Sequence, residues 1–152
     1  MIYNRNQKKA IRDFIKSIDK NYKVGFEDLY FQADTDTNTI YIGTLEYDQY
    51  AKYYNEWFNS EFPACENPNW WLMSLLHEIG HLETVDLELA TLHEQCMETL
   101  DFLDSVEACS IEDINYIYFQ MPCEWEATYW GASYYIDHKE KCDNFLKTLA
   151  IF

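Results

Sequence analysis

Two histidines lie four residues apart in the segment HEIGH, residues 77–81, and a glutamate follows the first of them. Each residue of an α-helix turns about 100°, so His81 would lie about 40° from His77 and one turn above it. Both imidazoles could then bind one metal ion, while Glu78 would stand beside that ion and act as general base on a zinc-bound water. The spacing therefore predicts a hydrolytic zinc site in which His77 and His81 are ligands.

A third ligand has to come from elsewhere in the chain, because catalytic zinc usually takes three protein ligands and a water. Thr84 and Leu87 stand where an extended form of the motif has glycine and histidine. A glutamate on a later helix is the main alternative. The helix predicted to begin near Pro122 carries two of them, Glu124 and Glu126.

Glu124 is the better placed of these two glutamates when their helical faces are compared. The residues within about 60° of Glu124 on that helix are Ala127, Thr128, Gly131 and Tyr135. The small Ala127 and Gly131 would let this helix lie close to the HEIGH helix. Glu126 lies on the opposite side, so Glu124 is the predicted third ligand and Glu126 is the alternative.

The order of HEIGH, Glu124, Ala127, Trp130 and Gly131 resembles the ImmA/IrrE-like metallopeptidases, which are relatives of the gluzincins. The resemblance covers these two helices and the order of a helix, a hairpin and the metal helix before them. It implies a small zincin-like metalloprotease domain that binds one Zn²⁺ and cleaves a protein substrate with narrow specificity. It also implies that an edge strand of the sheet holds an extended peptide beside the zinc.

Residues that would assist the chemistry are less clearly marked. Many relatives place Asp or Asn at the position of Thr128, where it can orient a ligand histidine, and Thr128 is predicted to do so more weakly. The candidates for stabilising the oxyanion are Tyr135, His138, Tyr134 and Tyr116. His93 also precedes a glutamate, but Met97 stands four residues later, so His93 is predicted to be a surface residue.

Hydrophobic periodicity predicts the elements that must position these residues. An amphipathic helix is expected over residues 5–20, a β-hairpin around the polar turn DTDTN within residues 24–45, and an aromatic helix over residues 47–62. The fold class is therefore α+β. We expect one mostly helical domain over residues 1–152, with a small antiparallel β-hairpin sheet beside the HEIGH helix.

Helix ends and an acidic region complete this outline. Asn67 is predicted to cap the HEIGH helix with Pro68 at its first position, and Ser110 with Asp113 has the form of a capping box. Residues 83–113 contain ten Asp or Glu and no Lys or Arg, yet they keep an apolar stripe at helical spacing. The stripe consists of Val85, Leu89, Leu92, Cys96, Leu100 and Leu103. An acidic surface helix packed by one face is expected.

Charge and composition restrict the partners. The net charge is -16, and the first 23 residues hold seven Lys or Arg against two Asp or Glu, which leaves four against 25 for the remainder. Such a surface repels nucleic acid and anionic lipid and suits a basic protein substrate. No secretory signal or membrane span is evident. Five widely spaced cysteines without a C-x-x-C pair are expected to be buried thiols and suit the cytoplasm.

Two other functions are compatible with the pattern. The chain could be an acidic protein-binding protein, such as an inhibitor or decoy, with a structural or vestigial zinc site. The same zinc water could also hydrolyse a small-molecule amide. A structural site has no need of Glu78, so the peptidase is the leading hypothesis.

Overall fold

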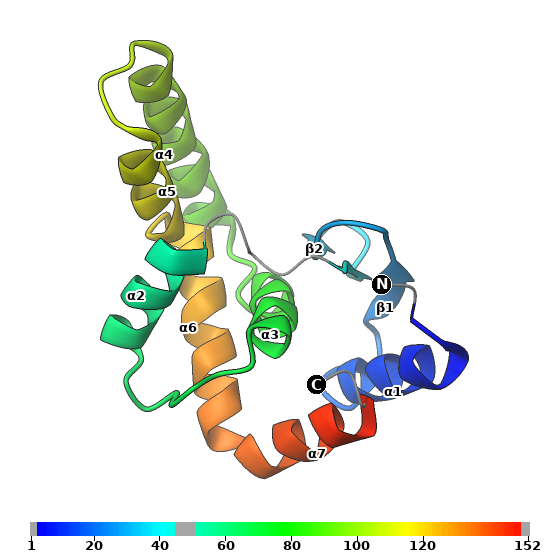
Figure 1. Ribbon diagram of the computed structural model, residues 1–152. Coiled ribbons are helices and arrows are strands. Elements are labelled where there is room, and N and C mark those ends of the chain that lie inside the picture. Colours follow the sequence, from blue (N-terminus) through cyan, green and yellow to red (C-terminus); the bar gives the residue numbers. More distant parts are fainter. Residues whose placement is uncertain (1–2, 45–50, 150–152) are drawn as a thin grey trace.

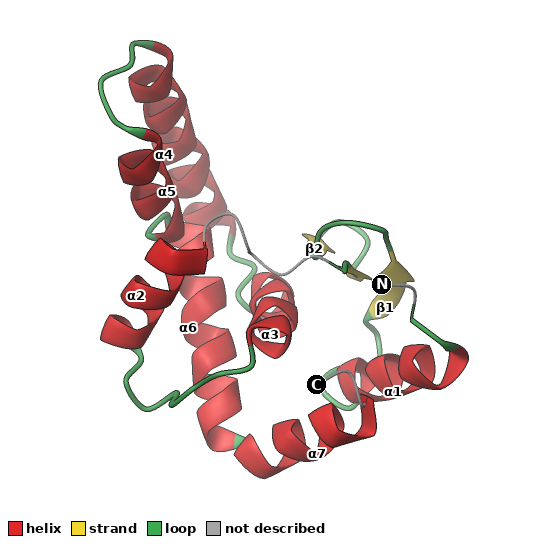
Figure 2. Cartoon of the chain, viewed as in Figure 1, coloured by secondary structure: helices red, strands yellow, loops and turns green. Residues whose placement is uncertain are grey.

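The computed structural model describes residues 3–44 and 51–149. These residues form seven helices and one small three-stranded sheet, which confirms the mostly helical α+β class. Figure 2 shows that the strands gather at one side of the molecule. The helices are α1 (Arg5–Lys16), α2 (Ala51–Glu61), α3 (Trp70–Glu83), α4 (Leu87–Ser105), α5 (Ile111–Phe119), α6 (Pro122–Asp137) and α7 (Lys139–Leu149).

The sheet is mixed, which corrects the expectation of an antiparallel hairpin alone. Strands β2 (Gln32–Asp34) and β3 (Thr39–Ile42) form the predicted hairpin, with Asp34 opposite Thr39. A third strand, β1 (Lys23–Phe26), pairs with the other side of β3 in the parallel direction. Periodicity does not reveal which strands are neighbours, because pairing depends on the path of residues 27–31 between β1 and β2.

The hairpin turn follows from its polar side chains. The carboxylate of Asp34 accepts hydrogen bonds from the backbone N–H groups of Asp36 and Thr37, at 3.0 and 3.1 Å. Asn38 then adopts a left-handed φ of 52°, which Asn tolerates better than most residues. The turn therefore brings β2 and β3 together, and both strands pack against α3.

Helix α3 lies at the centre of the molecule and packs most closely against α6 (Figure 1). Almost all of its residues from Trp71 to Leu82 are buried, so its apolar sequence is explained by neighbours on every side. The predicted cap is two residues early. Asn69 caps the helix by accepting a hydrogen bond from the Leu72 N–H at 2.9 Å, whereas Asn67 has a left-handed φ of 45°.

Aromatic contacts join the remaining elements to this centre. Helices α1 and α7 meet through stacked Phe14 and Phe145 rings, whose centroids are 4.0 Å apart. The Trp71 indole N–H donates to the Tyr3 hydroxyl at 2.8 Å, which links the first described residues to α3. Fully buried Phe58 of α2 packs edge-on against Trp70. Of the helix predicted over residues 47–62, residues 47–50 lie outside the described residues.

Helices α4 and α5 form an antiparallel pair that projects from the rest of the molecule (Figure 1). We call residues 87–119 the arm. The predicted capping box at Ser110 and Asp113 is confirmed. Of the predicted apolar stripe, Leu100 is buried and Leu92 is about half exposed, while Val85 precedes the helix and is 63% exposed. The apolar face of α4 is therefore covered less completely than the sequence predicted.

Two further observations bear on the expectations from composition. All five cysteines are free thiols, but only Cys65 and Cys142 are buried, and the other three are partly exposed. None of the helices in the described ranges has the length and apolar character needed to cross a membrane.

Candidate metal centre

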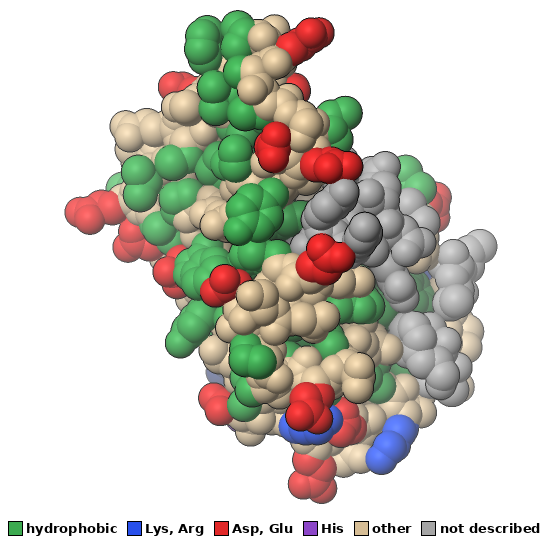
Figure 3. Space-filling view, turned by 60° about the vertical axis from the view of Figure 1, so that its left-hand side comes forward, with side chains coloured by type: hydrophobic (Ala, Val, Ile, Leu, Met, Phe, Trp, Pro, Cys, Tyr) green, Lys and Arg blue, Asp and Glu red, His purple; other side chains and the backbone are tan. Residues whose placement is uncertain are grey.

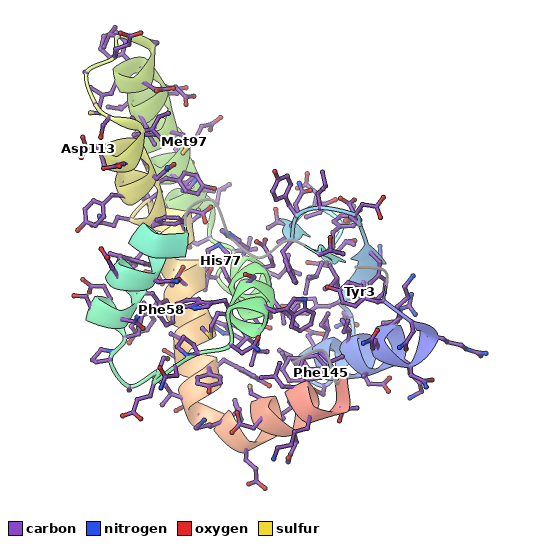
Figure 4. All side chains as sticks on the ribbon, in the orientation of Figure 1. Tyr3, Phe58, His77, Met97, Asp113 and Phe145 are labelled. Atoms are coloured by element: carbon purple, nitrogen blue, oxygen red, sulfur yellow. The ribbon has the colours of Figure 1, made fainter. Side chains whose placement is uncertain are left out.

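Three of the predicted site residues converge between α3 and α6. His77 and His81 come from α3, and Glu124 comes from the first turn of α6. One potential ligand atom from each lies within 4.8 Å of the others, and the described residues contain no other such group of three. Figure 4 shows His77 at the junction of α3, α6 and the base of the arm. Glu126, the alternative ligand, is not part of this group.

The separations of these atoms suit a tetrahedral ion. His77 Nε2 lies 2.9 Å from Glu124 Oε2 and 3.1 Å from His81 Nε2, and the third side of the triangle is 3.5 Å. Ligand atoms about 2.0–2.1 Å from a tetrahedral zinc lie roughly 3.3 Å apart. Two imidazoles and one carboxylate are also a donor set found in catalytic zinc sites. Both the chemistry and the spacing of the three residues therefore fit zinc.

Hydrogen bonds orient the central histidine. The Nδ1 atom of His77 lies 2.9 Å from the hydroxyl oxygen of Thr128, on the next turn of α6 after Glu124. When Nδ1 carries the proton, it donates a hydrogen bond to the Thr128 hydroxyl oxygen, and Nε2 presents its lone pair toward Glu124 and His81. The structure thus places Thr128 where the sequence predicted a partner for a ligand histidine.

Electrostatic interactions within the group are strong because it is buried. Burial lowers the pKa of His77, but its hydrogen bond with Glu124 and the charges of Glu124 and Glu78 outweigh burial and raise that pKa. Burial also opposes ionisation of Glu124, yet the two histidines hold the pKa of its carboxyl far below the usual range. A cation placed among these groups would be favoured by the carboxylates around it.

Glu78 is buried next to the three converging residues. Glu78 is only 6% exposed. Its charge is among the causes that raise the pKa values of His77 and Tyr118, so its carboxylate lies near both side chains. The i+1 position therefore carries a carboxylate beside the predicted ion, as the motif requires.

Tyr118 is a site residue that sequence reasoning missed. It lies near the end of α5, and its hydroxyl donates a hydrogen bond to Glu124 Oε1 at 3.0 Å. The other oxygen of that carboxylate, Oε2, points to the histidines. Burial and the charges of Glu124 and Glu78 raise the pKa of Tyr118, so its hydroxyl keeps its proton. No motif marks Tyr118, because its position depends on how α5 meets α6.

Close contact of two helix backbones holds the group together. A Cβ atom added at Gly80 would overlap the backbone of Ala127, including its Cα at 2.8 Å. A Cβ atom at Gly131 would meet the backbone of Leu76 at 3.1 Å, which is tight without being prohibitive. The expectation that small residues bring these helices together is confirmed. Gly80 lies between the two histidines, so this contact sets the distance from α3 to Glu124.

Three of the four candidates for oxyanion stabilisation, Tyr134, Tyr135 and His138, lie toward the end of α6 opposite Glu124. Tyr135 and His138 follow Glu124 by 11 and 14 residues, which corresponds to about 16 and 21 Å along a helix. The Tyr135 hydroxyl accepts a hydrogen bond from Lys139 at 3.1 Å, and the exposed His138 packs against Tyr134. Tyr116 is half exposed. Tyr135 does lie on the same face of α6 as Glu124, as predicted. The two residues are nevertheless far apart because they lie near opposite ends of the helix.

His93 also differs from its predicted role as a surface residue. It is partly buried, and its Nδ1 accepts a hydrogen bond from the backbone N–H of Cys123 at 3.2 Å. Cys123 is in the first turn of α6, where N–H groups lack partners within the helix, and Met121 provides no side-chain cap. His93 therefore caps α6 from α4 and ties the arm to the helix that carries Glu124.

No protein-family model matches this sequence, and no curated protein or solved structure is significantly similar to it.

Proposed function

We propose that this chain is a zinc metallopeptidase of the ImmA/IrrE-like type, with a zincin-like fold that cleaves a peptide bond in a protein substrate. The observation that carries this proposal is the convergence of His77, His81 and Glu124 beside the buried Glu78. A site that only stabilised the fold would have no use for a buried carboxylate at this fourth position.

Each residue of the site has a defined part in the proposed reaction. The imidazoles of His77 and His81 and the Oε2 atom of Glu124 would hold the ion. Zinc supplies a Lewis acid that polarises a carbonyl group and makes water acidic enough to react near neutral pH. The Glu78 carboxylate accepts a proton from the attacking water and returns it to the nitrogen of the leaving amine. Thr128 orients His77, and Tyr118 orients Glu124.

The surroundings of the site suit a peptide substrate. Strand β2 is an edge of the sheet and packs against α3, so an extended peptide could pair with its exposed edge. The resemblance to ImmA/IrrE-like metallopeptidases implies that the substrate is held by pairing of this kind. The free cysteines suit the reducing cytoplasm, which is where we propose that the protein acts.

Metal content is the first test of this proposal. Untagged protein should carry about one zinc per chain by mass spectrometry, and His77→Ala or Glu124→Ala should lose it. Glu126→Ala is the matched control, because Glu126 occupies the same helix turn outside the three converging residues, and it should keep the metal. No zinc in the wild type after zinc is added back, or equal loss in Glu126→Ala, would remove the proposal.

Catalysis is tested separately from metal binding. Glu78→Gln should keep zinc and the fold but lose peptide cleavage by about 10²- to 10⁴-fold, because it cannot accept the proton. Cleavage of a genuine substrate at the wild-type rate by this variant would exclude Glu78 as the general base.

A second candidate function is favoured by the arm. Its acidic, projecting surface would suit an inhibitor or decoy that binds a basic protein and keeps zinc only as a structural or vestigial ion. In that case charge reversal on the arm would abolish function and Glu78→Gln would leave it unchanged. The opposite result would favour the peptidase.

A further inference from the structure

The arm exposes apolar side chains that a surface helix would normally cover. Leu87 and Ile111 are 83% and 74% exposed, and Phe102 and Val106 are more than half exposed. In Figure 3 hydrophobic side chains gather over the upper part of the molecule, where the arm lies, with acidic side chains around them. Exposed apolar side chains that gather in one region of a surface often mark a binding site.

Two grooves flank α4 within this surface. One, with a volume of about 560 Å³, is lined mainly by apolar residues and includes no charged residue. The other, of about 380 Å³, lies between α4 and α5 and combines apolar walls with two carboxylates. We call it the acidic groove, and its lining includes Met97, Leu100, Asp101, Asp104, Ile114 and Tyr118. Unlike the first groove, it can make both apolar contacts and ionic contacts with a ligand.

The charge around the acidic groove is of one sign. From residue 83 to residue 119 the chain contains no Lys or Arg, so no cation in the arm itself neutralises Asp101 or Asp104. A phosphate-bearing ligand would be repelled by this charge. A Lys or Arg side chain matches the groove in both respects, since its aliphatic stem packs on apolar walls while its head reaches a carboxylate.

The acidic groove is also next to the metal centre. Tyr118 lines the groove, and its hydroxyl donates to Glu124, the predicted ligand from α6. Tyr118 and Glu124 therefore link the groove to the converging histidines. A segment bound in the groove would therefore lie close to the residue that contacts the predicted ligand Glu124.

We propose that the acidic groove binds a basic segment of the protein substrate, with Lys or Arg side chains at Asp101 and Asp104 and apolar side chains on Met97 and Ile114. The inference rests on the proposed peptidase function, which it deepens by assigning a substrate class. It makes the arm a recognition element that selects basic substrates and delivers them to the metal centre.

Binding is measured without cleavage so that the two proposals can fail separately. The full chain carrying Glu78→Gln is titrated with a fluorescent synthetic peptide of lysine and leucine with an amphipathic helical pattern. We expect Asp101→Lys/Asp104→Lys to weaken binding by at least about tenfold, because two attractive charges become repulsive. Asp101→Asn/Asp104→Asn, which perturbs folding less, should weaken it by a smaller factor. Circular dichroism checks that each variant is folded.

The matched control makes the same change in net charge at residues outside the arm. Glu66→Lys/Asp137→Lys changes the net charge equally at two exposed residues outside the arm, and it should affect binding far less. Equal weakening by both lysine pairs would overturn the proposal, because general attraction would then explain the binding. Absence of binding to the parent protein, or no response to any variant, would overturn it too.

A second peptide tests the apolar walls. A peptide with the same number of lysines but with glycine in place of leucine should bind more weakly at equal ionic strength, because it leaves Met97 and Ile114 uncovered. Equal affinity for the two peptides would contradict binding in the groove and would indicate that charge alone attracts the peptide. If these binding results hold while the protein lacks zinc or catalysis, the recognition surface stands and the peptidase does not.

Discussion

The α3–α6 pair and the arm are built by opposite rules, although both consist of two antiparallel helices. In the first, backbones touch at Gly80 and Ala127, and the polar side chains of the site form hydrogen bonds with one another. In the second, only Leu100 and Phe119 are buried, and acidic and apolar side chains face outward. In the proposed function, the α3–α6 pair, called the rigid pair below because its backbones touch, carries the chemistry, and the exposed arm carries recognition.

The largest effect on the rigid pair is expected from a side chain at Gly80 that pushes α3 and α6 apart. Gly80→Ala should destabilise the protein by at least about 2 kcal/mol, because overlap with the Ala127 backbone outweighs the gain of about 1 kcal/mol in helix propensity. Gly131→Ala should stay within about 1 kcal/mol of wild type, since its Cβ only touches Leu76. Urea unfolding measures both. Similar losses at the two positions would contradict the close contact inferred at Gly80.

The hydrogen bond from Tyr118 is the next strongest test, because it links the two regions. Tyr118→Phe should reduce zinc affinity by about tenfold or more, as the unsupported Glu124 carboxylate loses its orientation. Tyr116→Phe, two residues away and half exposed, should leave affinity unchanged. Competition with a chromophoric chelator gives both values. An unchanged affinity in Tyr118→Phe would show that its hydroxyl does not position Glu124.

The pH dependence of zinc binding tests the electrostatics of the rigid pair. Zinc needs neutral imidazoles, so affinity should fall by about tenfold per pH unit below the raised pKa of His77. Glu78 raises that pKa, so Glu78→Gln should lower it and move the decline to lower pH by up to about one unit. Zinc titrations over a pH series measure this. A shift to higher pH would contradict the placement of the Glu78 carboxylate.

The smallest effects are expected in the arm. Asp101→Asn/Asp104→Asn should change the free energy of unfolding by less than about 0.5 kcal/mol and leave zinc content unchanged, because exposed charges contribute little to stability. Chemical unfolding and metal analysis measure the two quantities. A large loss of either would mean that the arm belongs to the structural core of the site, and the contrast between the two regions would fail.

Much of the rigid pair could be predicted from local sequence rules. Helical geometry alone places His77 and His81 on one face, and it places Glu124 with Ala127, Thr128 and Gly131. Helices α1 to α6 begin within a few residues of the positions that the sequence indicated, whereas α7 was not predicted and α4 ends well before residue 113. The cap of α3 was misplaced because Asn67 and Asn69 are both good capping residues, and the backbone angle at Asn67 decides between them.

Residues that depend on contacts between elements could not be predicted in this way. The parallel pairing of β1 needs the path of a five-residue connection. His93 and Tyr118 have no motif, and they reach α6 only because α4 and α5 fold against its first turn. Tyr135 shared the predicted face of Glu124 but not its position along the axis, and a helical wheel does not represent that distance.

The sequence by itself determined which residues face one another within each helix, because a helix repeats every 3.6 residues regardless of its surroundings. Tertiary structure alone decided how the helices meet, namely that Glu124 reaches both histidines, that Tyr118 supports it and that a groove opens between α4 and α5. These features come from packing of residues distant in the chain, and packing is set by the shapes of whole surfaces that no short motif contains.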